Sequence, residues 1–424
     1  MSLSIHRRRV LPDVVCLGAI VLLATAPMWR MGWLRDDWLF LWRALEPASA
    51  PPGAAGVFPR PVADLFWKFS TFVAGDAPWS MHVLVLLAWL VLAAGLVRWH
   101  RAWGGGTMGA LLAVFVLTAH GALVEPRLWA SAGNGVLAAA LAIWGVWLLR
   151  EDGIRPWRFG LGAVLLALGI LARADAVLLL ALPLAERRRC ELSGWSTVGL
   201  MGAALLAWMM VAAGDMPVVA PAAGGRLLRL LLVPWGPPLP VFGAMALGVG
   251  GLAGAAVVVV RSTRQRPVAL AAIAGAVVLA GSVTGWSPAG RYVLMPTIAL
   301  ALLLGAAEGR NRLLLVPWLA LHLAGIWFGN TTADLLGRST AETGLYRVVR
   351  DAPGPLDRLV VQDPPPLGWT GSAADAENVA SAARRRSVAV AIRGSDLPVA
   401  DSWAAVRWDG AAWILSPPAH DPRP

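Results

Sequence analysis

The feature that most constrains this chain is a series of long apolar runs separated by short turns rich in arginine. A helix needs about 20 apolar residues to cross the hydrocarbon core of a bilayer, and such runs recur as far as residue 330. Hydrophobic residues make up 58% of the chain and charged residues only 14%, whereas about a quarter of a soluble domain is charged. The sequence therefore predicts a polytopic, all-α membrane bundle.

We expect about eleven membrane-spanning helices, judged by the lengths of the apolar runs. The expected spans are residues 10–30, 79–97, 107–124, 129–149, 159–172, 174–185, 195–213, 239–260, 267–285, 292–308 and 312–329. The N-terminal run is long and shows no small-residue cleavage pattern, so it is interpreted as an uncleaved first helix rather than a signal peptide.

The arginines predict the orientation of these spans. If the spans alternate, one side receives the clusters at Arg7–Arg9, Arg98/Arg101, Arg150/Arg155/Arg158, Arg187–Arg189, Arg261/Arg264/Arg266 and Arg310/Arg312. By the positive-inside rule this side is the cytoplasm, so the first loop, residues 31–78, faces outward. The same rule explains the net charge of +11 more simply than contact with nucleic acid does, and no nucleic-acid partner is expected.

Residues 159–186 allow two topologies. As a single span they would bury Arg173 and Asp175 in the middle of the membrane and move every later arginine cluster to the outside. As two short helices that meet at Arg173-Ala174-Asp175 they satisfy the positive-inside rule. We therefore expect two helices, with the turn between them close to a water-filled cavity.

The composition changes after residue 330, where apolar and polar residues alternate around Pro and Asp-Gly turns. Trp408-Asp409-Gly410, between two apolar runs, predicts a β-hairpin, and a helix is expected near residues 333–350. We thus divide the chain into a transmembrane domain, 1–330, and a small extracytoplasmic α+β domain, 331–424. The cysteines, Cys16 and Cys190, indicate neither a disulfide framework nor a metal cluster.

Four polar clusters from distant parts of the chain fall on the predicted outer face. They are Asp36/Asp37, Glu125/Arg127, Arg173/Asp175 and Arg291/Tyr292. Polar groups near a bilayer are costly unless they line a cavity or pair with one another, so we expect a shared pocket. Guanidinium groups match phosphate oxygens, and a carboxylate beside them can accept a proton from an attacking hydroxyl.

Each cluster also has a plainer interpretation. The acid pair can mark a helix end at the interface, and Glu125 with Arg127 can be an ordinary loop pair. Arg173 with Asp175 can be a structural ion pair between the two short helices, while Arg291 can anchor a phospholipid. His82, near the outer end of the second span, is more often a satisfied bundle residue than a ligand, and the histidines show no metal-binding spacing.

Five short motifs, taken together and in this order, resemble the GT-C superfamily of membrane glycosyltransferases. They are "RDDW" at 35–38, "FPRPV" at 58–62, "VEPRLWASAGNGVLAAALAIW" at 124–144, "LARADAVLLLALPL" at 171–184 and "AGRYVLMP" at 289–296. The resemblance is greatest to the protein O-mannosyltransferase-like branch and its relatives with transmembrane and tetratricopeptide regions. It covers roughly residues 10–310.

The chain departs from that pattern at several positions. Ala132-Gly133 stands where the family usually has Ser-Gly, and Arg173 and Asp175 replace the usual Lys-Glu pair. On the second helix His82 is followed by Val85 and Trp89, where the family carries Asn and a second His. The tetratricopeptide tail is absent, so donor and acceptor can differ from those of the relatives.

The resemblance implies an inverting transfer of a sugar, of the hexosyl type, from a polyprenyl-phosphate-linked donor to a hydroxyl of a glycan, lipid or protein acceptor. The reaction would take place at the periplasmic face of a bacterial inner membrane. Asp37 would act as the general base and Asp36 would orient the acceptor or a divalent metal, Mg or Mn, although the two roles can be reversed. The remaining assignments are Arg291, Arg173 and Arg60 as ligands of the donor phosphate and Glu125, Asp175, Tyr292, His82 and Trp129 as pocket residues.

Two rival hypotheses remain. A transporter or flippase of lipid-linked substrates would line a path through the whole membrane with polar residues, whereas the polar groups other than arginine gather here on the outer side. A non-catalytic subunit of an envelope glycan assembly would keep the fold and lose the chemistry, because fold alone does not establish function.

Overall fold

The computed structural model places most of the N-terminal half of the chain, one later helix and much of the C-terminal region. It describes residues 2–47, 60–102, 105–120, 123–149, 156–180, 182, 294–305, 330–353, 356, 358–362, 373–392, 404–408 and 412–416. The predicted spans at 195–213, 239–260, 267–285 and 312–329 lie outside these residues.

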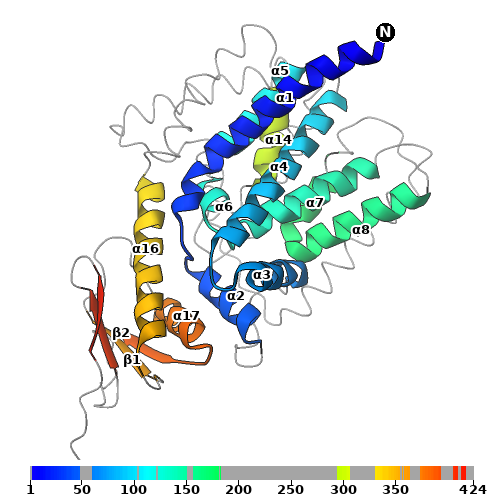
Figure 1. The fold of residues 1–424 in the computed structure, drawn as a ribbon. Coiled ribbons are helices and arrows are strands. Elements are labelled where there is room, and N and C mark those ends of the chain that lie inside the picture. The colour runs from blue at the N-terminus through cyan, green and yellow to red at the C-terminus, as the bar shows by residue number, and fades with distance from the viewer. Residues whose placement is uncertain are drawn as a thin grey trace, which may run out of the picture.

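The described part of the bundle consists of apolar helices that run side by side (Figure 1). They are α1 (Ser2–Thr25) with the 3₁₀ helix η1 (Ala26–Arg30), α4 (Trp79–Ala102), α5 (Thr107–Ala119), α6 (Val124–Leu128), α7 (Asn134–Leu148), α8 (Pro156–Ala172), the 3₁₀ helix η3 (Ala174–Leu180) and α14 (Leu294–Gly305). Among the described helices, α4 is long and apolar enough to cross a membrane, while α5, α7 and α8 are apolar but shorter. The number of crossings remains a prediction.

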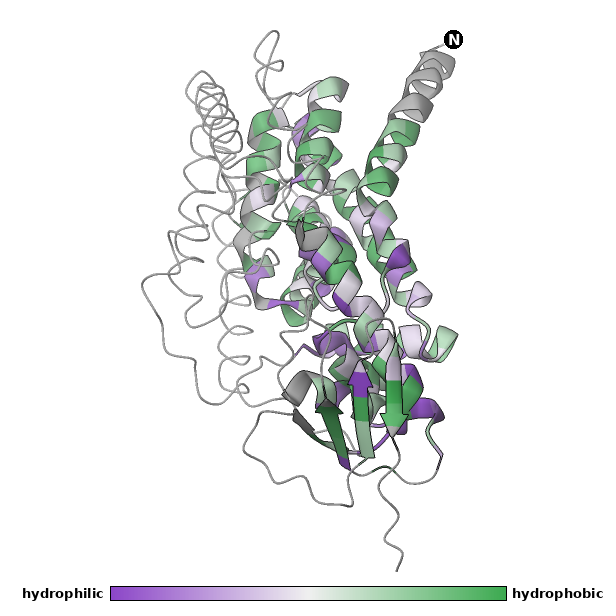
Figure 2. Ribbon diagram, turned by 90° about the vertical axis from the view of Figure 1, so that its left-hand side faces the viewer, coloured by the Kyte–Doolittle hydropathy of each residue, from purple (hydrophilic) through white to green (hydrophobic). Residues whose placement is uncertain are grey.

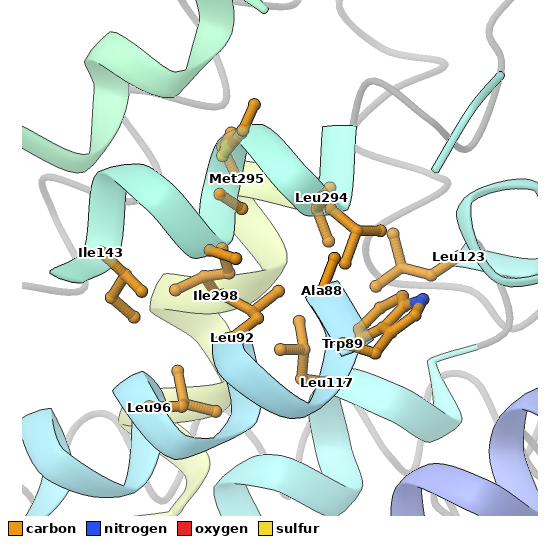
Figure 3. Close-up of a cluster of buried hydrophobic side chains, with 14 of the residues drawn as sticks. Ala88, Trp89, Leu92, Leu96, Leu117, Leu123, Ile143, Leu294, Met295 and Ile298 are labelled. Atoms are coloured by element: carbon orange, nitrogen blue, oxygen red, sulfur yellow. The ribbon is translucent and has the colours of Figure 1, made fainter. Parts of the chain in front are cut away.

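The core of the bundle forms where α4, α5, α7 and α14 meet (Figure 3). Trp89, Leu92 and Leu96 lie on one face of α4, since they recur at spacings of three and four residues. Their fully buried side chains belong to the same cluster as Leu117 of α5, Ile143 of α7 and Ile298 of α14. The predicted break at Arg173 is confirmed, because α8 ends at Ala172 and η3 begins at Ala174.

Glycines let α7 and α8 approach each other closely. A Cβ atom added to Gly145 of α7 would lie 2.7 Å from the backbone nitrogen of Leu166 and 2.8 Å from the carbonyl oxygen of Gly162, both on α8. These neighbours are backbone atoms, which cannot rotate away as a side chain can. The contact therefore depends on the absence of a side chain at Gly145.

We expect Gly145→Ala to lower the free energy of unfolding in detergent by about 1–3 kcal/mol, because an extra methyl group in a closely packed contact forces the helices apart. Gly160→Ala is the matched control on α8, where an added Cβ has no neighbour within 4 Å. It should be neutral or slightly stabilising, since alanine is the better helix former. Equal unfolding midpoints for the two variants would contradict this account of the packing.

A second layer lies at the end of the bundle opposite the N-terminus (Figure 1). It comprises α2 (Asp36–Leu45), α3 (Pro61–Ala74), α16 (Asn330–Asp351), α17 (Ala373–Arg384) and the strands β1 (Arg358–Gln362), β2 (Ala389–Ile392), β3 (Ala404–Trp408) and β4 (Trp413–Ser416). Figure 2 shows apolar ribbons over most of the bundle and more hydrophilic segments toward this layer. The predicted helix near 333–350 is confirmed as α16.

The strands form one mixed sheet in the order β2-β1-β3-β4. β1 is parallel to β2, to which α17 connects it, and parallel to β3. β3 and β4 are antiparallel, with Trp408 opposite Trp413. The hairpin predicted around Trp408-Asp409-Gly410 is therefore confirmed.

One hydrophobic cluster joins the C-terminal elements to the first loop. Trp38 of α2 and Trp67 of α3 belong to the same buried cluster as Leu345 of α16, Val379 of α17 and Val406 of β3. The domain boundary near residue 330 remains a prediction, and this core takes side chains from both sides of it. The C-terminal elements are thus packed directly against the loop that carries the acidic pair.

Candidate functional site

The acidic pair opens α2 after a short non-helical segment. Asp36 and Asp37 occupy the first turn of the helix, where carboxylates interact favourably with the positive end of the helix dipole. Arg35, directly before them, has a left-handed backbone conformation with φ of 50°. Asp36 is exposed, whereas Asp37 is fully buried. Neighbouring carboxylates therefore have very different surroundings.

Asp37 connects the first loop to the turn between α6 and α7. Its Oδ2 accepts a hydrogen bond from the backbone N–H of Leu34 at 3.0 Å, and its Oδ1 accepts one from the backbone N–H of Ser131 at 2.7 Å. Burial raises the pKa of Asp37 well above its ordinary value, although the backbone donors oppose this shift. The charge of Asp36 raises the pKa of Asp37 further.

Arg173 and Asp175 form an ion pair at the break between α8 and η3. Nε of Arg173 donates to both carboxylate oxygens of Asp175 at 2.9 Å, and the side chains are only 8% and 12% exposed. Nη1 of Arg173 lies next to Gly135 of α7, where an added Cβ would be 3.3 Å from it. The same Cβ would be 3.6 Å from the side chain of Leu294, the first residue of α14. The ion pair thus lies where α7 and α14 begin.

The turn from Ser131 to Gly135 brings these two groups together. The backbone N–H of Ser131 donates to Asp37, and Nη1 of Arg173 would lie 3.3 Å from a Cβ atom added to Gly135. Four residues span at most about 14 Å even when fully extended. Here the segment is shorter, because Asn134 N–H bonds to the Ser131 carbonyl at 3.3 Å. Asp37 and Arg173 therefore lie near opposite ends of one turn, and a pocket shared by the two pairs remains a prediction.

Arg291 and Tyr292 lie outside the described residues. Arg60 is partly exposed at the start of α3, where its carbonyl accepts the N–H of Asp64. Glu125, in the first turn of α6, is also partly exposed.

Other predicted pocket residues hold the backbone in place. His82 is 2% exposed, and its Nε2 lies 2.9 Å from the carbonyl oxygen of Met31. The buried indole of Trp129 donates to the carbonyl of Leu34 at 2.9 Å. Both side chains thus form hydrogen bonds with the backbone of residues 31–34, directly before the acidic loop turns into α2.

Arg127, the partner predicted for Glu125, is fully buried and donates to the carbonyls of Thr118 and His120. These carbonyls lie at the C-terminal end of α5, where the last backbone acceptors of a helix need partners. Arg127 therefore closes the end of α5 in the described structure.

Sequence reasoning missed Glu342 of α16. This fully buried carboxylate pairs through Oε1 with Nε of Arg338 at 2.6 Å. Its Oε2 accepts the backbone N–H of Arg35 at 2.7 Å and the indole N–H of Trp38 at 2.8 Å. Burial raises the pKa of Glu342, which the charge of Arg338 opposes. An Arg and a Glu four residues apart usually indicate an exposed helical pair, so the spacing gave no sign of this role.

The described residues do not by themselves form a metal site. No three His, Cys, Asp or Glu side chains gather within the described ranges, and Asp37 already accepts two backbone hydrogen bonds. A Mg or Mn site usually needs several oxygen ligands. The possible metal therefore remains a prediction from the resemblance, and no step below depends on it.

Comparison with known proteins identifies the fold. No family model and no curated protein sequence matches the chain. Among solved structures, ArnT from Cupriavidus metallidurans, crystallised with undecaprenyl phosphate, has a TM-score of 0.55 at 14% identity, over 93% of this chain and 92% of ArnT. The Archaeoglobus fulgidus oligosaccharyltransferase, crystallised with Zn and sulfate, has a TM-score of 0.50 at 13% identity, over 88% of this chain and 61% of its own. The protein therefore has the fold of the GT-C membrane glycosyltransferases.

Proposed function

We propose that this protein is a GT-C glycosyltransferase of a bacterial inner membrane, with its active site at the periplasmic face. It transfers a sugar from a polyprenyl-phosphate-linked donor to an acceptor hydroxyl and inverts the anomeric carbon. The observation that carries the proposal is the placement of Asp37 and Arg173 against two ends of the Ser131–Gly135 turn. A base and a cation beside the same turn match the two charges that develop in the reaction. ArnT, with the same fold, was crystallised with undecaprenyl phosphate.

In the proposed reaction the acceptor oxygen attacks the anomeric carbon of the donor sugar while its proton passes to the Asp37 carboxylate. The bond between the anomeric carbon and the phosphate oxygen breaks, and its electron pair leaves with the polyprenyl phosphate. A single displacement inverts the anomeric centre. The raised pKa of Asp37 suits this role, because a general base works best when its pKa approaches the operating pH.

Arg173 stabilises the leaving phosphate in this scheme. Asp175 holds the Nε side of the guanidinium, and Nη1 lies near the start of α7. Arg291, three residues before the first residue of α14, and Arg60 are proposed as further phosphate ligands. Exposed Asp36 orients the acceptor. The elements of residues 331–424 hold the acidic loop in place through Glu342.

The proposal is tested with the purified full chain in liposomes that contain undecaprenyl phosphate linked to mannose, glucose or arabinose. Release of undecaprenyl phosphate is measured with acceptor lipids or glycans present. We expect turnover by the wild type with at least one donor and about a 10²–10³-fold loss in Arg173→Gln, because a group that stabilises developing charge is removed.

Arg98→Gln is the matched control. Arg98 lies near the C-terminal end of α4, and its guanidinium is 5.3 Å from the ring centre of Trp147. Sugar transfer by this variant should therefore equal that of the wild type. Transport of the intact donor without release of undecaprenyl phosphate would favour the flippase hypothesis instead. Equal turnover by Arg173→Gln and the wild type would remove Arg173 from the site.

A further inference from the structure

Asn134, the first residue of α7, has a side chain whose hydrogen-bonding groups are not satisfied. The residue is fully buried, and neither Oδ1 nor Nδ2 forms a hydrogen bond with any residue that the structure describes. Most buried side-chain amides have at least one partner, since an unpaired polar group in the interior costs free energy. The carboxamide of Asn134 is therefore a candidate for hydrogen bonds to a ligand.

Helix capping, the usual structural role of asparagine at a helix start, does not account for Asn134. The N-cap position of α7 is Gly133, and no side chain forms a capping bond there. The backbone N–H of Asn134 is already bonded to the Ser131 carbonyl at 3.3 Å. The carboxamide therefore contributes nothing to the described end of the helix.

The position of Asn134 indicates what it binds. It lies in the turn whose residue Ser131 donates to Asp37, and it directly precedes Gly135, where an added Cβ would be 3.3 Å from Nη1 of Arg173. In a displacement at the anomeric carbon, the sugar ring stands between the base that takes the acceptor proton and the cation that holds the leaving phosphate. Along the chain, Asn134 lies between Ser131, which is bonded to Asp37, and Gly135, which lies near Arg173.

We propose that Asn134 binds hydroxyl groups of the transferred sugar, an inference that rests on the proposed function. A carboxamide donates and accepts at once, which matches neighbouring sugar hydroxyls. A phosphate offers only acceptors and would leave Oδ1 unpaired. Asn134 is thus a specificity-determining residue for the sugar, distinct from the arginines that hold the phosphate.

The test compares Asn134→Leu with the wild type, because leucine has the same branched skeleton and no polar atoms. Binding to the purified full chain is measured for undecaprenyl phosphate alone and for the same lipid linked to mannose, glucose or arabinose. We expect Asn134→Leu to bind the preferred sugar-linked lipid about 10- to 100-fold more weakly, since the hydroxyls lose their partner. Its affinity for undecaprenyl phosphate alone should change less than about twofold, because the phosphate contacts remain.

Thermal unfolding separates this role from a structural one. Replacing an unpaired buried amide with leucine should leave the unfolding midpoint unchanged or raise it, whereas loss of a structural hydrogen bond would lower it. Arg98→Gln again serves as the control for ligand binding.

The possible failures are distinguishable. If the wild type binds and transfers a sugar but Asn134→Leu binds the sugar-linked lipid equally well, the inference is overturned and the proposed function stands. Equal loss of affinity for the sugar-free lipid, or a wild type that binds both lipids equally, also overturns it. A wild type that neither binds nor transfers from any donor removes the proposed function, and this inference with it.

Discussion

Asp37→Asn is expected to reduce sugar transfer by about 10²–10⁴-fold, the usual contribution of a general base. Asparagine fills the same volume but cannot accept the acceptor proton. The substitution also places an amide NH₂ opposite a backbone donor, because both carboxylate oxygens accept N–H groups, from Leu34 and Ser131. The unfolding midpoint of the variant must therefore be measured together with its transfer rate.

Asp36→Asn separates the roles of the two acids. If Asp37 is the base, the wild-type rate rises with pH as the carboxylate ionises, through a pKa above the ordinary 3.8. Removing the charge of Asp36 lowers the pKa of Asp37, since a neighbouring negative charge disfavours ionisation. The acid limb of the pH–rate profile should then persist in Asp36→Asn and move to lower pH.

The opposite assignment predicts a different profile. If Asp36 is the base, Asp36→Asn loses most of the activity over the whole pH range, and no shifted acid limb is seen. Asp36 is exposed, so its replacement should leave the unfolding midpoint nearly unchanged. Unchanged transfer in both single variants would remove the acid pair from the mechanism.

Glu342→Gln is expected to lower the free energy of unfolding by about 3–5 kcal/mol, because it leaves a buried guanidinium without its counter-charge. Arg338 is only 3% exposed and pairs with Oε1 of Glu342 at 2.6 Å. The amide cannot serve both sides of the site. Its NH₂ group faces either Arg338 or the donors of Arg35 and Trp38.

The double variant Arg338→Met/Glu342→Gln tests this explanation. The buried positive charge is removed, and the single amide oxygen can take the place of Oε2, which accepts from both Arg35 and Trp38 in the wild type. We expect the double variant to recover more than half of the stability lost by Glu342→Gln, since replacing both members of a buried ion pair is often nearly neutral.

Arg350→Gln is the matched control on the same helix. Arg350 pairs with Asp76 at 3.3 Å, with side chains 46% and 38% exposed, and exposed ion pairs contribute little to stability. Its unfolding midpoint should stay close to that of the wild type. A double variant as unstable as Glu342→Gln would show that the hydrogen bonds to the loop, rather than the counter-charge, determine the effect.

The rate of sugar transfer should also depend on the contacts of Glu342. Glu342 holds the backbone of Arg35, the left-handed residue that precedes the acidic pair. Loss of this bond frees the loop, so Glu342→Gln should reduce turnover even at temperatures where the variant is folded. The C-terminal elements would then support catalysis by fixing the loop.

Several features of the fold were predictable because they depend on short stretches of sequence. The arginine pattern and the pair at Arg173 and Asp175 predicted a break in an apolar run, and α8 does end at Ala172. Alternation around Asp409-Gly410 predicted the hairpin of β3 and β4. Hydropathy, charge and turn chemistry act over a few residues, so a single chain reveals them.

The candidate site was predictable only in part. The sequence predicted that Asp37 and Arg173 share a pocket, but not that Asp37 accepts from Ser131 while Arg173 lies near Gly135 of the same turn. His82 and Trp129 were expected in the pocket, and the structure shows them bonded to the backbone carbonyls of Met31 and Leu34. The direction in which a side chain points depends on the segments packed against it, and the periodicity of one stretch of sequence does not reveal those segments.

The sequence by itself determined the class of this protein, an apolar helical bundle with polar groups gathered toward one end, because composition and arginine placement respond to the bilayer directly. Only the tertiary structure decided which acid of the pair is buried and that Glu342 supports the acidic loop from α16. It also decided that the buried side chain of Asn134 has no hydrogen-bond partner among the described residues. Asp37 and Glu342 are buried and paired by segments up to 307 residues apart in the chain. Such contacts form only in the folded protein, so the local sequence does not predict them.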